Sequence, residues 1–255
     1  MNHEKRIGNF TSSEIWKLMT SDRSGKGFGA PALSYIAEKN NERRLGRRLT
    51  DETNAKPTSW GKLCEKYVNE KLLGTDYEIL NDVTFKHPTI DCWVGSPDTI
   101  RHNSDGSKVV GDTKAPYTLS SFCGLVNPVY CGNIEEEGEL LMYQLRNGFV
   151  DNLGNSHPAH KDAEKYYWQL VSNAILMNTD YAELIIFMPY ESEIKALKDL
   201  ADGNPDLYWM MYSELSSIKD GGFYKNITKI EFEVHQSDKD FLTERVLMAE
   251  KFLIK

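Results

Sequence analysis

The sequence has no long hydrophobic run, no repeat, no low-complexity tract and no long linker rich in proline, glycine or serine. A helix that spans a bilayer needs roughly 18 consecutive apolar residues, so we expect no membrane partner. The first residues, MNHEKRIGNFTSSE, contain no apolar stretch and do not look like a secretory signal, which favours a cytoplasmic location. We expect a single domain over residues 1–255.

Paired cysteines and excess positive charge are missing too. Cys64, Cys92, Cys123 and Cys131 form no CxxC pair, which argues against a structural zinc site and favours reduced, mostly buried thiols. The 30 Lys and Arg stand against 38 Asp and Glu, for a net charge of −8. This argues against a protein that coats nucleic acid through bulk charge. It does not exclude an enzyme that holds DNA in a local basic groove around acidic metal ligands.

Helical and strand patterns alternate along the chain. Thr11 with Glu14 forms a capping box and predicts a helix over 11–19. Periodicity predicts the other helices at 31–44, 60–74, 163–178, near 191–218 and at 238–255, and strands at 77–87, 91–101, 108–115, 181–189 and 227–235. The HNSDGS segment (102–107) predicts a tight reversal between two strands. The expected fold class is α/β or α+β, a central mixed β-sheet flanked by helices.

The segment 117–163 is rich in Gly, Asn and Glu and poorly patterned, so we interpret it as a long insertion or lid.

Three charged residues lie around that reversal. Asp98 and Asp112 occupy adjoining strands, and Asp112 and Lys114 alternate on one strand and therefore share a face. Two carboxylates beside a lysine suit Mg²⁺, with Mn²⁺ able to substitute, because that ion accepts one or two carboxylates, waters and a substrate phosphate. The lysine would orient or deprotonate a metal-bound water for phosphodiester hydrolysis. The alternative is a surface hairpin with solvated charges.

Four short motifs favour the nuclease interpretation. In order and spacing, RIGNFTSSEI (6–15), WGKLCE (60–65), GSPD (95–98) and GDTKAP (111–116) resemble the lambda-exonuclease or YqaJ-type viral recombination nucleases of the PD-(D/E)xK superfamily. Asp112 stands where the family has glutamate, and Ala115 where it has cysteine. The resemblance covers about residues 1–125 and, more loosely, 163–190. It implies a restriction-endonuclease-like core.

The resemblance also assigns Glu65 to the metal site. In the sequence, Gly61, Glu65, Val68 and Leu72 fall on one helical face, so Glu65 is either a surface residue or turned inward with a partner. By the same resemblance, Asp98, Asp112 and the Thr113 carbonyl hold one metal, and Glu65 contributes to that site or to a second.

Arg6 and Ser13 match, at the family's spacing, an arginine and a serine that grip a terminal DNA phosphate. Ser13 falls in the first turn of the predicted helix, where free N–H groups attract anions, and Arg6 can offer a bidentate fork. The alternative is a plain capping serine beside a solvated arginine.

A family glutamine that places the attacking water matches Gln169, if 117–163 carries an insertion of about 30 residues. Gln144 is a rival, because it too is followed by leucine. We prefer Gln169, because a predicted helix and strand follow it, as they do in the family.

The leading hypothesis is a Mg²⁺-dependent DNA exonuclease of viral or prophage recombination, with Glu65, Asp98, Asp112, Lys114 and Gln169 in its catalytic site. The family implies double-stranded DNA ends as substrate, 5′→3′ polarity, a homotrimer, and a single-strand annealing protein as partner in the host cytoplasm. The alternatives are an endonuclease or structure-specific nuclease on the same core, and a catalytically inactive DNA-binding module.

Overall fold

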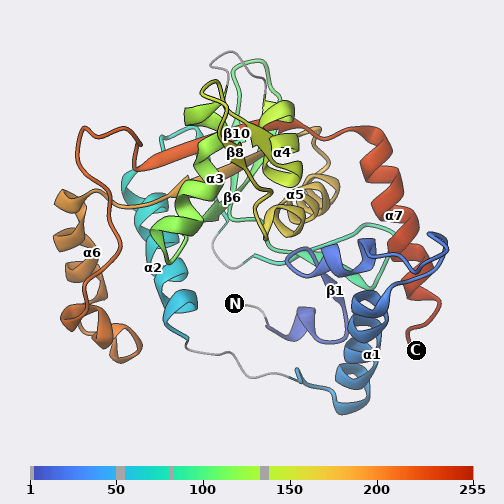
Figure 1. Ribbon diagram of the computed structural model, residues 1–255. Helices are drawn as coiled ribbons and strands as arrows, with labels where there is room; N and C mark the ends of the chain where they lie inside the picture. Colours follow the sequence, from blue (N-terminus) through green and yellow to red (C-terminus); the bar gives the residue numbers. More distant parts are fainter. Residues whose placement is uncertain (1–2, 50–54, 81–82, 133–137, 255) are drawn as a thin grey trace.

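The computed structural model describes residues 3–49, 55–80, 83–132 and 138–254 (Figure 1). Residues 81–82 of the predicted strand 77–87, 133–137 of the predicted insertion and 255 of the predicted last helix lie outside the described residues.

A five-stranded mixed sheet, in the order β10-β9-β6-β5-β2, forms the centre of the molecule. Its strands are β2 (Tyr77–Ile79), β5 (Thr99–His102), β6 (Lys108–Lys114), β9 (Tyr181–Phe187) and β10 (Ile227–Glu233). β6 and β9 are parallel and the other neighbours are antiparallel. The predicted reversal between β5 and β6 is confirmed, with Gly106 at a φ of 87° that favours glycine.

A smaller sheet accounts for the ends of two predicted strands. It has the order β1-β4-β3, from β1 (Phe10–Thr11), β3 (Phe85–Lys86) and β4 (Trp93–Gly95). The predicted strand 91–101 is therefore divided between the two sheets. Pro97, which has no N–H to donate to a ladder, stands between β4 and β5. This break decides where Asp98 lies.

Helices cover both faces of the central sheet (Figure 1). The α-helices are α1 (Ala30–Leu45), α2 (Lys56–Lys71), α3 (Leu119–Cys131), α4 (Gly138–Asn147), α5 (Ala163–Met177), α6 (Ile194–Ala201) and α7 (Gln236–Glu250), and the 3-10 helices are η1 (His3–Arg6), η2 (Ile15–Met19), η3 (Glu191–Glu193) and η4 (Pro205–Tyr212). Leu184 and Ile186 of β9 pack in the core that α5 joins. Ile185 and Phe187, which point the other way, pack in a second core with α2 and α6. The predicted fold class is thus confirmed.

The predicted helix over 11–19 is wrong in its first half. Thr11 ends β1, turns follow, and only Ile15–Met19 is helical, as a 3-10 helix. The Thr11 hydroxyl lies within hydrogen-bonding distance of the Ser13 and Tyr35 hydroxyls, while the Glu14 carboxylate pairs with Lys17. Tertiary contacts to α1 have replaced the capping box that the sequence suggested.

The segment 117–163 is more regular than its sequence pattern indicates. It contains α3, α4 and the hairpin of β7 (Phe149–Val150) and β8 (Ser156–His157). Phe122, Leu125 and Met142 from its two helices are buried in the core with α5 and the sheet. Whether it is an insertion relative to the nuclease family stays a prediction.

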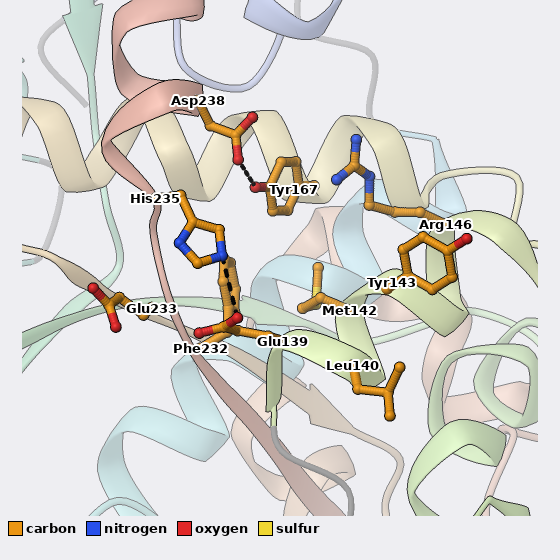
Figure 2. Close-up of a pocket in the computed structure, with 10 residues that line it drawn as sticks. All are labelled: Glu139, Leu140, Met142, Tyr143, Arg146, Tyr167, Phe232, Glu233, His235 and Asp238. Carbon is orange, nitrogen blue, oxygen red and sulfur yellow. Dashed lines mark hydrogen bonds and ion pairs between the residues drawn. The ribbon is translucent and has the colours of Figure 1, made fainter.

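A groove of about 640 Å³ lies where α4, β10 and the starts of α5 and α7 meet (Figure 2). Arg146 of α4 lies over the Tyr167 ring at 3.9 Å, the Tyr167 hydroxyl donates to Asp238, and His235 faces Glu139 at 3.1 Å. These contacts join α4, α5 and the start of α7 to one another.

Among the described helices, none combines the length and the apolar character needed to cross a bilayer.

Candidate active site

Asp98 lies where β5 and β6 separate. Their pairing starts at Thr99 opposite Gly111, and the Asp98 N–H still donates to the Gly111 carbonyl at 3.2 Å. One step further, the Asp98 Oδ2 accepts the Thr113 N–H at 2.7 Å. The carboxylate therefore replaces a strand partner at the end of the ladder, which fixes it beside β6.

Asp112 and Lys114 point to the same face of β6, as their spacing predicts. Asp112 is 1% exposed, whereas Lys114 is partly exposed. The Lys114 ammonium forms an ion pair with Asp112 Oδ2, and Gln169 Nε2 donates to Asp112 Oδ1 at 2.5 Å. The sheet face and α5 thus bring the two β6 residues and Gln169 together.

Gln169, the preferred of the two glutamines, is 6% exposed and lies on the inner face of α5. Gln144 lies on α4. Tyr166, one turn before Gln169, holds its ring 5.2 Å from the Lys114 nitrogen. Sequence reasoning missed Tyr166, although its i, i+3 spacing to Gln169 places it on the same helical face.

Glu65 approaches the cluster from the opposite face of the sheet. It lies half-buried on α2, next to the buried Cys64 and one turn before the buried Val68. Its negative charge acts on Asp98 and helps to raise the pKa of that carboxyl group. Both sides of the sheet therefore contribute acidic groups to one place.

Negative charge exceeds positive charge in this cluster. Burial raises the pKa of Asp98 well above its ordinary value, and the charges of Asp112 and Glu65 add to the rise. The Lys114 ammonium and the Thr113 N–H oppose it only in part. Burial alone would lower the pKa of Lys114, but the charges of Asp112 and Asp98 outweigh it and raise that pKa. Lys114 is therefore held as a cation.

One unsatisfied oxygen accompanies this charge. Among the described residues, the buried Gln169 Oε1 accepts no hydrogen bond, whereas the buried Asp112 Oδ2 is contacted by the Lys114 ammonium. Buried polar atoms are normally satisfied, so their exceptions need an explanation. A bound cation with its water shell would supply the missing partner.

The carboxylates do not form a complete metal cage. Over the described part of the chain, no three Asp, Glu, His or Cys side chains gather closely enough to hold an ion by themselves. Mg²⁺ is commonly bound by one or two carboxylates, with waters and substrate oxygens in the other positions. Asp98 and Asp112, with a main-chain oxygen such as that of Thr113, fit this requirement.

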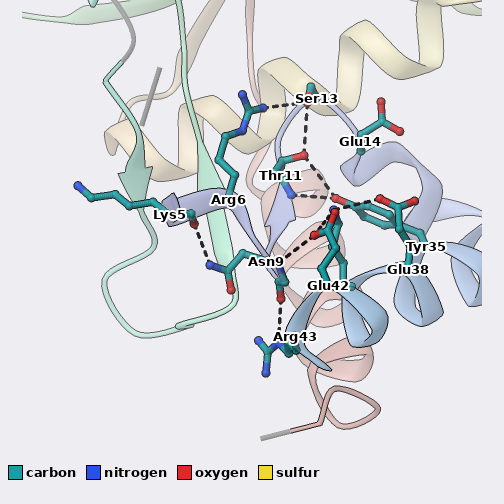
Figure 3. Close-up of polar contacts among 12 residues, drawn as sticks. Lys5, Arg6, Asn9, Thr11, Ser13, Glu14, Tyr35, Glu38, Glu42 and Arg43 are labelled. Atoms are coloured by element: carbon teal, nitrogen blue, oxygen red, sulfur yellow. Dashed lines mark hydrogen bonds and ion pairs between the residues drawn. The ribbon is translucent and has the colours of Figure 1, made fainter. Parts of the chain in front are cut away.

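Arg6 and Ser13 lie side by side, but Ser13 is not in the helix that the sequence predicted (Figure 3). Arg6 Nη2 donates to Ser13 Oγ at 3.3 Å. Ser13 lies in the turns between β1 and η2, so the argument from a capped α-helix does not hold. The segment is instead fastened to α1, where Tyr35 accepts the Thr11 N–H at 2.9 Å and Glu42 accepts the Gly8 N–H at 2.9 Å.

No family model and no curated protein matches this chain. Solved structures do match over nearly its whole length, three exonuclease structures among them. The alkaline exonuclease LHK-Exo from Laribacter hongkongensis has a TM-score of 0.53 at 14% identity, covering 97% of this chain and 88% of its own. Its complex with dAMP has a TM-score of 0.53 at 15% identity, with the same coverage. A phage-related exonuclease from Haemophilus somnus 129PT has a TM-score of 0.54 at 15% identity, covering 96% and 92%.

The chain has the fold of the alkaline and phage-related exonucleases. At 14–15% identity this similarity concerns the fold, which is the one that the nuclease resemblance of the four sequence motifs implied. The chemistry must be argued from the cluster itself.

Proposed function

We propose that this protein is a Mg²⁺-dependent deoxyribonuclease that hydrolyses phosphodiester bonds from the ends of duplex DNA. Its main support is the buried cluster of Asp98, Asp112, Lys114 and Gln169, in which acidic groups exceed basic ones at the ends of two core strands. Pronounced pKa perturbation by burial and like charge is typical of catalytic sites. The exonuclease fold and the dAMP complex of one structural neighbour add support.

Asp98, Asp112 and the Thr113 carbonyl would hold the metal, with Glu65 at the same site or a second one. Bound there, Mg²⁺ or its substitute Mn²⁺ would polarise the phosphate and stabilise the leaving oxygen. The excess of acidic over basic groups in the cluster favours cation binding.

The remaining groups orient the reactants. Lys114, held as a cation, would face the phosphate and the attacking water with its ammonium group. Gln169 donates to Asp112 through its nitrogen and keeps its Oε1 available, so it can accept a hydrogen bond from that water. Tyr166 limits the positions open to the Lys114 side chain.

Arg6 and Ser13 would bind the terminal 5′-phosphate of the strand being degraded. Both are partly exposed, and their mutual hydrogen bond points a guanidinium and a hydroxyl at one place. The 5′→3′ polarity, the trimer, the annealing-protein partner and the role in viral or prophage recombination in a host cytoplasm remain predictions from the family resemblance.

The decisive experiment is digestion of linear duplex DNA that bears a 5′-phosphate, with closed circular DNA alongside, in Mg²⁺ and in chelator. Wild type is compared with Lys114→Ala, and with Lys195→Ala on the exposed surface of α6 as a matched control. We expect Mg²⁺-dependent loss of the linear DNA only, abolished by Lys114→Ala and retained by Lys195→Ala. Arg6→Ala should reduce the preference for a 5′-phosphorylated over a 5′-hydroxyl end about tenfold.

Other outcomes would support other functions. Cutting of the circle would support an endonuclease on the same core. If neither DNA is cut but both shift on a native gel, the protein is a DNA-binding module. If neither is cut or bound, the proposal is wrong.

A further inference from the structure

A second groove, of about 540 Å³, lies between the first half of α3 and the segment 157–161 that precedes α5. Its polar lining consists of hydroxyl, amide, imidazole and ammonium groups. The residues that matter are Ser120, Ser121, Asn127, His157, His160 and Lys161.

The charge of this groove differs from that of the groove in Figure 2. The groove of Figure 2 is lined by three carboxylates, those of Glu139, Glu233 and Asp238. The α3 groove has no carboxylate in its lining, although the chain has 38 Asp and Glu. Asp151 pairs with His157 at 3.0 Å but is not part of that lining. Lys161, which is exposed, gives this lining a positive charge, and Asp162, whose charge acts on His160, follows it in the chain but is not part of the lining.

Hydrogen bonds prepare one hydroxyl in the groove as a donor. His160 Nδ1 accepts the Asp162 N–H at 3.2 Å, so in the neutral ring the proton resides on Nε2. That nitrogen lies 3.1 Å from Ser121 Oγ and donates to it. Burial lowers the pKa of His160, which favours this neutral ring. The Ser121 hydroxyl, already an acceptor, keeps its proton for a ligand.

The fold leaves room for this arrangement at Gly124. A Cβ on Gly124 would lie 3.1 Å from His160 Cδ2, closer than a side chain comfortably packs. Glycine therefore allows the imidazole to lie against α3 and to reach Ser121.

The groove is also next to the proposed catalytic centre. The Tyr166 ring lies 5.2 Å from the Lys114 nitrogen on one side and 6.2 Å from the His160 ring on the other. Thr118, four residues after Lys114, lines the groove. Phosphates of one DNA strand repeat about every 3.4 Å along the helix axis, so the groove lies within a few phosphates of the catalytic cluster.

We propose that the α3 groove binds a backbone phosphate of the DNA strand being cut, adjacent to the bond that is hydrolysed. Lys161 supplies the charge, and the hydroxyls of Ser120 and Ser121 donate hydrogen bonds to the phosphate oxygens. This inference rests on the proposed nuclease function and deepens it, because it assigns the path of the strand on one side of the catalytic cluster.

The test measures binding and cleavage separately. Lys161→Ala and Ser121→Ala are compared with wild type and with Lys195→Ala, an exposed lysine on α6. In chelator, fluorescence anisotropy with a labelled, 5′-phosphorylated single-stranded oligonucleotide gives the Kd at several salt concentrations. In Mg²⁺, digestion of linear duplex gives kcat and KM, and dAMP serves as a competitor in both assays.

For Lys161→Ala we expect a Kd and a KM about fivefold higher, with kcat nearly unchanged. The slope of log Kd against log salt should fall by about 0.7, the value for one phosphate contact on a single strand. Ser121→Ala should raise the Kd about threefold without changing that slope, because it removes a hydrogen bond and no charge. Lys195→Ala should match wild type in both assays.

Two results would overturn the inference while leaving the nuclease proposal intact. One is active enzyme in which both groove variants keep the wild-type Kd, KM and salt slope. The other is weaker inhibition by dAMP with unchanged oligonucleotide affinity, which would make the groove a site for released nucleotide. If wild type neither binds nor cleaves any DNA, the proposed function itself fails.

Discussion

The same central sheet buries carboxylates in two places and treats them differently. Glu183 on β9 is 3% exposed, yet it accepts the Tyr77 hydroxyl at 2.6 Å and lies 3.7 Å from Arg101. Asp112 on the adjoining β6 is 1% exposed, and its partners are the Lys114 ammonium and the Gln169 side-chain amide.

The difference lies in the partners. Around Glu183, burial raises the pKa of the carboxyl group, but the Tyr77 hydrogen bond and the charges of Lys229 and Arg101 oppose the rise. Around Asp98, burial, Asp112 and Glu65 all raise the pKa, and only Lys114 and the Thr113 N–H oppose the rise. The Glu183 network is a structural one that fastens strands together. The Asp98–Asp112 cluster is left short of positive charge, which is typical of a site that awaits a cation and a substrate.

The largest expected effect is the loss of cleavage activity in Asp112→Asn. The variant keeps the shape of the side chain but removes the charge that would hold the metal, so cleavage of linear duplex should fall about 10³-fold. Circular dichroism and thermal unfolding should show an intact fold, because Gln169 and the strand ladder remain. Retention of even a tenth of the activity would show that Asp112 does not belong to the catalytic site.

Glu183→Ala should have the opposite result, a loss of stability with little loss of activity. It leaves Tyr77 without its buried acceptor and removes the negative charge 3.7 Å from Arg101, so the free energy of unfolding should fall by about 3 kcal/mol, as measured in urea. The specific activity of the protein that remains folded should be close to that of wild type. Loss of activity without loss of stability would contradict the structural role of this network.

Tyr77→Phe tests how much the Tyr77 hydroxyl alone contributes to the stability of the Glu183 network. It removes the hydrogen bond that Tyr77 donates to Glu183 and the one that it accepts from Lys229, and it preserves the Arg101 contact, so the loss in unfolding free energy should be about 1.5 kcal/mol. The double variant Tyr77→Phe with Glu183→Ala should be less destabilised than the sum of the two, because the pair shares one interaction. Strict additivity would show that the two residues act independently.

The smallest expected change in stability is for Asp98→Asn, and it is an increase. Asparagine can still accept the Thr113 N–H but carries no charge beside Asp112 and Glu65, so stability should rise by about 1 kcal/mol at pH 7. The folded-state pKa of Asp98 is raised, so its contribution favours folding at low pH and is lost as pH rises through that pKa. The advantage of the variant should therefore grow with pH.

Magnesium provides the control for Asp98→Asn. The ion should raise the Tm of wild type and have a smaller effect on the variant, a measurement that does not depend on catalysis. An equal Mg²⁺ effect on both proteins would remove Asp98 from the proposed metal ligands.

Local patterns predicted most of the regular structure. The helices α1, α2, α5 and α7 and the strands β6, β9 and β10 lie in the predicted segments, although α7 ends at Glu250, because each places apolar residues at the expected period in one of the two cores. The patterns failed where long-range contacts decide. Thr11 belongs to a strand since β1 pairs with β4 across the molecule, and α3 and α4 acquire their buried faces only by packing against distant elements.

The sequence by itself determined that Asp112 and Lys114 share a face of one strand, since alternation along a strand is a local property. It also determined the reversal that returns the chain beside Asp98. Only the tertiary structure decided that Gln169 contacts Asp112, that Glu65 acts on Asp98 from the other face of the sheet, and that Tyr166 and His160 join the catalytic cluster to the α3 groove. These contacts join residues on different elements, many of them far apart in the chain, and their distances depend on how helices pack on a twisted sheet. That packing is set by the whole core and by no single segment.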